Sequence, residues 1–200
     1  MSRIPAESAL FATPRGLSLL QEASLQLDGA PAMVRGLAHS PAALEGFLRF
    51  RASLASGQLP APARVLIALA VSEINGCAYC LAAHVAAGAW QGLTDREIAD
   101  ARQCRSANPK HQAMLTLVQS VVIQRGAVST HEFFAARDAG LSHGELTEIV
   151  GHISLSLFTN YFNQLALTEM EIPPPGSRSP AASAARPAQR DEVPANPQHS

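Results

Sequence analysis

The chain has 200 residues, of which 47% are hydrophobic and 16% are charged, and its formal net charge at pH 7 is −1. This length and apolar content suit one domain with a substantial core, and the balanced charge offers no basic surface for nucleic acid. No apolar run approaches the roughly 20 residues that span a bilayer, and charged residues and prolines interrupt the first twenty positions. We therefore expect a cytoplasmic protein with neither a membrane nor a nucleic-acid partner.

The pattern of apolar residues predicts an all-α fold, a compact multi-helix domain, because alternating runs of β-branched residues are missing. In the first half of the chain we expect helices over residues 14–27, 42–54 and 63–74. Ser40 is a candidate cap for the second of these helices, since Pro41 follows it at the first helical position.

The second half of the chain predicts helices that end near residues 103, 124, 139 and 170, with prolines and caps at their starts. Thr94 with Glu97 and Ser142 with Glu145 have the spacing of capping boxes. Residues 172–200 contain seven of the fourteen prolines and few large apolar side chains. We expect a single helical domain over residues 1–171 and a disordered tail over 172–200.

Cys77 and Cys80, followed by His84, form the most informative group of residues in the chain. The break at Asn75–Gly76 predicts a helix that begins at the cysteines. The N-terminus of a helix favours a thiolate, and an imidazole one turn after Cys80 can act as a base or, when charged, stabilise the anion. Because a reducing compartment disfavours structural disulfides, this spacing indicates a catalytic or metal-binding pair.

Two other interpretations of these residues remain open. A structural zinc ion would need a fourth ligand, which Cys104 or a distant histidine could supply, the candidates being His111, His143 and His152. Alternatively, the two cysteines are inert and buried in a helix. We expect Cys104 to be a spectator on the surface, and His152 to be a core or interface residue with a hydrogen-bond partner.

The run over residues 68–84, with its Cys77 and Cys80 spacing and His84, resembles the alkylhydroperoxidase D-like branch of the carboxymuconolactone decarboxylase family. Leu93–Thr94 and residues 158–163 extend the likeness to about residues 40–170. The resemblance implies an all-α homotrimer or homohexamer without a bound cofactor.

The resemblance also implies a function, a thiol-dependent peroxidase that reduces a small hydroperoxide. Cys80 would attack the peroxide and become a sulfenic acid, Cys77 would resolve it as a disulfide, and His84 would assist proton movement. A dithiol protein, lipoyl-bearing or thioredoxin-like, would then reduce the disulfide. The family's other branch suggests a lactone decarboxylase as an alternative, and a redox-sensing or metal-binding module is the alternative without catalysis.

One position departs from the family pattern. Alkylhydroperoxidase D members carry a proton-relay glutamate twelve positions before the first cysteine, where this chain has Val65. Valine cannot relay protons. Glu73, four positions before Cys77, is a candidate replacement, although the Asn75–Gly76 break leaves its direction undetermined.

Overall fold

The computed structural model describes residues 2–6, 13–27 and 29–170. This part of the chain forms helices and contains no strand, which confirms the all-α prediction. The predicted tail over residues 172–200 lies outside the described residues. The helices are α1 (Pro14–Leu27), α2 (Ala32–Leu37), α3 (Pro41–Ala55), α4 (Ala61–Ile74), α5 (Ala78–Trp90), α6 (Asp95–Arg102), α7 (Pro109–Ile123), α8 (Thr130–Asp138) and α9 (His143–Ala166).

The predicted caps define where the helices begin. The Ser40 side chain accepts a hydrogen bond from the Ala43 amide at the start of α3. Both predicted capping boxes are present, at the starts of α6 and α9. A third box, Ser129 with Glu132, opens α8. Short polar side chains therefore satisfy amide groups that the first turn of a helix leaves free.

The structure differs from the predicted helices in two places. The short helix α2 was not predicted, because its six residues include Gly36 and no side chain caps its start. Helix α9 ends at Ala166, four residues before the predicted end, since Leu167 adopts a left-handed conformation with φ of 50°. The Ala166 carbonyl then accepts a hydrogen bond from the Arg3 amide at 2.7 Å. The N-terminal segment therefore satisfies a carbonyl group that the last turn of the helix leaves free.

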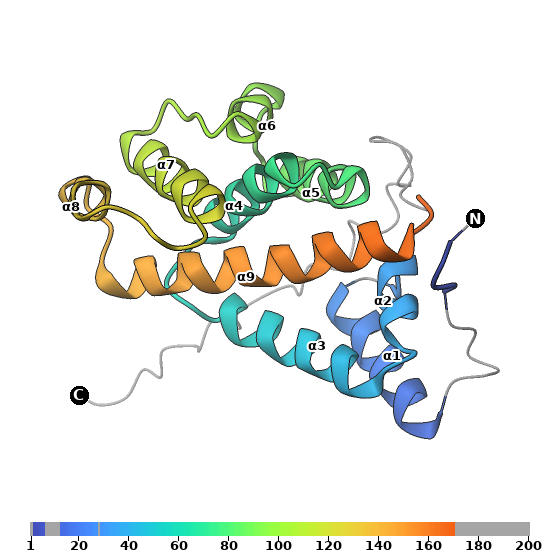
Figure 1. The fold of residues 1–200 in the computed structure, drawn as a ribbon. Coiled ribbons are helices and arrows are strands. Elements are labelled where there is room, and N and C mark those ends of the chain that lie inside the picture. Colours follow the sequence, from blue (N-terminus) through green and yellow to red (C-terminus); the bar gives the residue numbers. More distant parts are fainter. Residues whose placement is uncertain (1, 7–12, 28, 171–200) are drawn as a thin grey trace, which may run out of the picture.

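Helix α9 runs across the molecule between two groups of helices (Figure 1). Helices α1, α2 and α3 lie on one side of it, and α4 to α7 lie on the other. Helix α4 packs against α5, α6, α7 and α9, and its inner face is buried at Leu66, Leu69 and Ala70. One apolar cluster surrounds α4 and α7, and a second joins α1, α2 and α3 to the start of α5.

Among the described residues, none of the helices combines the length and the apolar character that a membrane crossing requires.

Candidate functional site

A tight turn between α4 and α5 positions the two cysteines. Gly76 has a φ of +65°, which a residue without a Cβ adopts at little cost, and the chain reverses there. Cys77 is the N-cap of α5, and its sulfur accepts a hydrogen bond from the Cys80 amide at 3.3 Å. The prediction that the helix begins at the cysteines is therefore confirmed.

Cys77 and Cys80 are joined by a disulfide, with their Cα atoms 5.3 Å apart. The two residues are 2% and 3% exposed. Their surroundings differ, however, because Cys80 lines a cavity and Cys77 does not. Cys80 and His84, one turn apart on α5, therefore face the cavity together, whereas Cys77 is not part of its wall.

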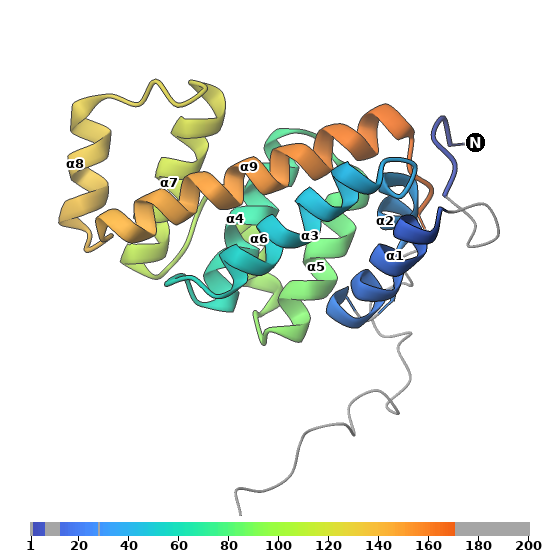
Figure 2. The ribbon, with the colours of Figure 1, turned by 90° about the horizontal axis from the view of Figure 1, so that it is seen from below.

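The cavity has a volume of about 470 Å³ and lies between α3, α4, α5 and α9. Figure 2 shows α3 running in front of α4 and α5, with α9 beside it. Each of these helices contributes residues at helical spacing: Phe47, Arg51 and Ala55 from α3; Ala61, Arg64, Val65 and Ala68 from α4; Cys80, Ala83, His84, Ala87 and Gln91 from α5; His152, Leu155, Ser156, Thr159 and Asn163 from α9. Leu27, Pro31 and Met33 complete the wall.

His84 lies one turn after Cys80 and faces the same cavity. Burial lowers the pKa of His84 from 6.5 to about 4, because a charged imidazole loses its hydration there. The ring is therefore neutral at pH 7. Of the two roles that the sequence left open, the structure favours a base or neutral hydrogen-bond partner over a cation.

Asn163 on α9 contacts the cysteine pair directly. Its Nδ2 donates a hydrogen bond to the sulfur of Cys80 at 3.2 Å, while its Oδ1 is buried and has no partner among the described residues. The sequence does not predict that Asn163 contacts the Cys80 sulfur. The available signal was an amide in the late segment that resembles the family, but nothing in the sequence showed that it would face a sulfur.

A second asparagine of α9 holds the turn before the cysteines. The Oδ1 of Asn160 accepts a hydrogen bond from Asn75 Nδ2 at 2.9 Å, and its Nδ2 donates to Ser72 Oγ at 3.4 Å. Asn160 is fully buried. Gln164 adds a hydrogen bond to the Asn75 carbonyl at 2.9 Å. Helix α9 therefore fixes both the turn and the sulfur that follows it.

The two acid candidates occupy different places. Val65 lines the cavity, so an apolar side chain stands at the position where the resemblance implies a glutamate. Glu73 is not part of the cavity wall, and its carboxylate instead pairs with Arg102 Nε at 2.7 Å. Glu73 therefore does not take the place of the missing acid.

The expectation for His152 is confirmed in part, since its side chain is buried, whereas the expectation that Cys104 lies on the surface is wrong. His152 is 8% exposed and lines the cavity, and its Nε2 has no hydrogen-bond partner among the described residues. Burial, reinforced by the charge of Arg64, lowers the pKa of His152. Cys104 is buried at 5% exposure rather than lying on the surface, and its burial raises the pKa of the thiol.

The residues proposed for a zinc site do not assemble in this structure. Cys104 belongs to the apolar cluster around α4 and α7, whereas Cys77 and Cys80 belong to the other cluster. In the part of the chain that the structure describes, no three His, Cys, Asp or Glu side chains gather closely enough to hold a metal ion.

Residues 41–108 match the Carboxymuconolactone decarboxylase family. No curated protein gives a significant match to the sequence.

Several solved structures share the fold. The core of an alkylhydroperoxidase D, a peroxidase-related protein from Ralstonia eutropha, has 22% identity and a TM-score of 0.73, covering 85% of this chain and 92% of that chain. A peroxidase-related protein from Silicibacter has 18% identity and a TM-score of 0.70, covering 83% and 91%. The debrominase Bmp8 has 16% identity and a TM-score of 0.71, covering 84% and 91%. At these identities the likeness establishes the fold.

Proposed function

Because residues 41–108 match the carboxymuconolactone decarboxylase family and the chain resembles its alkylhydroperoxidase D-like branch, we propose that it is a thiol-dependent peroxidase that cycles between a dithiol and a disulfide. The observation that carries this proposal is the position of the Cys80 sulfur. It lines a cavity of about 470 Å³, bonds to the sulfur of Cys77 and accepts a hydrogen bond from Asn163.

The first step is attack of the Cys80 thiolate on the terminal oxygen of a hydroperoxide. The O–O bond breaks, the sulfur becomes a sulfenic acid, and the alkoxide leaves as an alcohol after it takes a proton. The Cys77 thiol then attacks the sulfenic sulfur, which forms the disulfide and releases water. A dithiol protein, lipoyl-bearing or thioredoxin-like, returns both thiols by exchange and is itself oxidised to a disulfide. A reducing compartment such as the cytoplasm supplies this donor.

The surroundings of Cys80 suit the reduced state as well. In the dithiol form the N-terminus of α5 and the Asn163 amide would stabilise the thiolate. Neutral His84 would relay the thiol proton to the leaving oxygen within the same step. Cys77 is bonded to Cys80 but is not part of the cavity wall, which suits a resolving thiol.

Peroxide consumption with dithiothreitol as the reductant tests this proposal. The Cys80→Ser variant should lose activity. Cys77→Ser, reduced and then freed of dithiothreitol, should consume one equivalent of peroxide and hold a sulfenic acid that dimedone traps. Cys104→Ser is the matched control and should keep the wild-type rate, since Cys104 belongs to a different cluster. Equal rates for wild type and Cys80→Ser would remove the peroxidase assignment.

Because a debrominase shares this fold, the fold does not distinguish debromination from peroxide reduction. That protein has also been crystallised with 2,3,4-tribromopyrrole. Bromide release from a brominated pyrrole, measured in parallel, tells the two reactions apart: wild-type protein that releases bromide and leaves hydroperoxides intact would replace our proposal.

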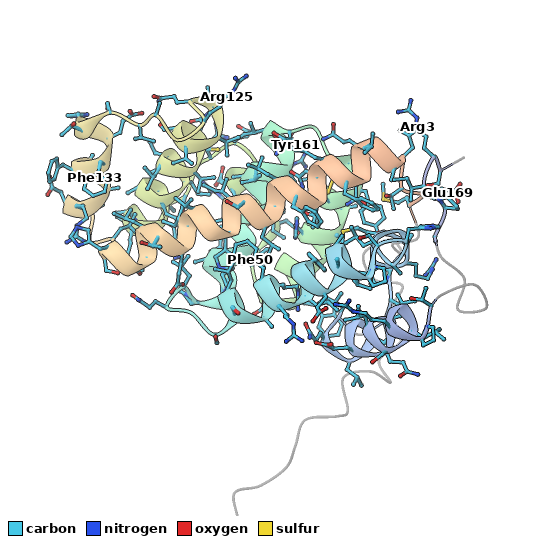
Figure 3. The ribbon with its side chains drawn as sticks, turned by 60° about the horizontal axis from the view of Figure 1, so that its bottom comes forward. Arg3, Phe50, Arg125, Phe133, Tyr161 and Glu169 are labelled. Atoms are coloured by element: carbon cyan, nitrogen blue, oxygen red, sulfur yellow. A yellow bond between two sulfur atoms is a disulfide. The ribbon has the colours of Figure 1, made fainter. Side chains whose placement is uncertain are left out.

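We also propose that the chain assembles as a homotrimer or homohexamer. The outer face of α9 exposes apolar side chains at helical spacing, namely Val150, Phe158, Tyr161 and Leu165, which are 41% to 64% exposed. Tyr161 on α9 and Phe50 on α3 are labelled in Figure 3. A stripe of this kind favours burial against another copy. Light scattering of wild type and of Tyr161→Glu checks it, with a smaller particle expected for the variant.

A further inference from the structure

Two arginines line the cavity at the end away from the cysteines. Arg51 lies in the last turns of α3 and Arg64 in the first turn of α4, and both are partly buried. Burial lowers the pKa of Arg51, and the positive charge of Arg64 lowers it further. Two guanidinium groups that repel each other in a partly dry site are unfavourable unless an anion joins them.

The described part of the chain supplies no such anion. No carboxylate lies within ion-pair distance of Arg51 or Arg64, and Arg51 makes no hydrogen bond there. Arg64 Nη1 donates to the carbonyl groups of Leu54 and Ala55 at the end of α3. This anchors Arg64 and leaves its other donors available.

Among the described residues, the one acid that influences His152 beside Arg64 is itself engaged. Glu148 attracts a proton to His152, but its carboxylate oxygens accept hydrogen bonds from the Gln58 and Leu59 amides at 2.7 and 2.9 Å. The buried Nε2 of His152 has no partner among the described residues. The arginine end of the cavity thus combines unpaired positive charge with an unpartnered buried nitrogen.

An apolar stretch separates the arginines from the reactive sulfur. On α9, His152 marks the arginine end and Asn163 marks the sulfur end, eleven positions later. At 1.5 Å per residue these two positions are about 16 Å apart along the helix. The wall between them carries Leu155, Val65 and Ala68, together with the hydroxyl groups of Ser156 and Thr159.

We propose that the Arg51–Arg64 end of the cavity binds the carboxylate of an amphipathic hydroperoxide, whose apolar chain lies along the middle of the cavity and whose peroxide group reaches Cys80. Planar guanidinium groups bind carboxylates through paired hydrogen bonds, and an apolar chain matches the wall. This proposal names the substrate class of the proposed peroxidase, and its reaction rests on that proposed function. Carboxylate binding depends only on the cavity.

Binding to the disulfide form separates the two questions, because no turnover is involved. Isothermal titration calorimetry with decanoate, decanol and decyl phosphate compares the head groups on one chain length. Wild type should bind decanoate at least about tenfold more tightly than decanol, the effect of a charge-assisted hydrogen bond. Arg51→Gln should lose that preference and unfold at the wild-type temperature, since Arg51 makes no hydrogen bond within the described residues.

The matched control is Arg49→Gln, two positions earlier on the same helix. Arg49 is 72% exposed and pairs with Glu45 outside the cavity, so this variant should keep the preference for decanoate. Equal affinities for decanoate and decanol, no binding of either, an unchanged preference in Arg51→Gln, or tighter binding of decyl phosphate would overturn the carboxylate assignment. Selective binding without peroxide turnover would remove the proposed reaction and leave the carboxylate site in place.

Discussion

Burial of a neutral His84 should make the protein less stable as the pH falls from 7 to 5. The pKa of His84 is about 4 in the folded protein, whereas the unfolded chain has the ordinary value of 6.5. Between these values the unfolded state binds more protons, so the free energy of unfolding decreases as the pH falls. From pH 7 to pH 5 the two pKa values give a loss of about 2 kcal/mol from this one side chain.

Urea denaturation at both pH values measures this loss for wild type, His84→Gln and His131→Gln. Glutamine does not titrate, so His84→Gln should lose about 2 kcal/mol less than wild type over this interval. The exposed His131 serves as the control and should match wild type.

Other titrating groups do not disturb the comparison. Glu132, whose pKa a hydrogen bond from Ser120 lowers to about 2, changes stability only as the pH falls below about 4.5. His152, whose pKa burial also lowers, contributes alike to all three proteins. Identical losses in wild type and His84→Gln would refute a buried, neutral imidazole at position 84.

Three further outcomes follow from the contacts around the cysteines. Replacing Asn163 by Leu removes the amide donor to the Cys80 sulfur and should raise the pKa of that thiol by about 1 to 2 units. The pH dependence of alkylation in reduced protein measures this pKa, and an unchanged value would contradict the hydrogen bond. Cys104, buried and with a raised pKa, should react with iodoacetamide only after unfolding, so modification of native reduced protein at the rate of Cys80 would contradict its burial. Asn160→Ala removes its hydrogen bonds to the partly buried Asn75 and the buried Ser72 and should lower the free energy of unfolding by about 2 kcal/mol in urea, with wild-type stability as the contrary result.

The parts of the site that the sequence revealed are those that depend on neighbours along the chain. Cys77, Cys80 and His84 lie within eight positions, and the glycine break at Gly76 indicates where their helix begins. Local spacing decides which side chains of one helix share a face. The pairing of the two thiols and the placement of His84 beside Cys80 follow from that spacing.

The parts that the sequence did not reveal come from packing between distant helices. Asn163 and Cys80 are 83 positions apart in the sequence. His152 and Arg51 belong to α9 and α3, helices that are distant from the cysteines in the sequence. Helix α9 carries apolar residues on both its inner and its exposed faces. Periodicity alone therefore does not tell which of its polar side chains face the cavity.

The electrostatic design of the cavity follows from these placements. Neutral His84 and apolar Val65 leave the sulfur end without a full charge, while Arg51 and Arg64 lie at the end that His152 marks, about 16 Å along α9 from Asn163. The Coulomb interaction between groups separated by that distance is weak even where a site is partly buried. Stabilisation of a Cys80 thiolate must therefore come from fixed dipoles, the N-terminal amides of α5 and the side chain of Asn163, which salt screens little at contact distance. The positive charge is thereby left to hold the far end of a ligand, and recognition and chemistry occupy opposite ends of one cavity.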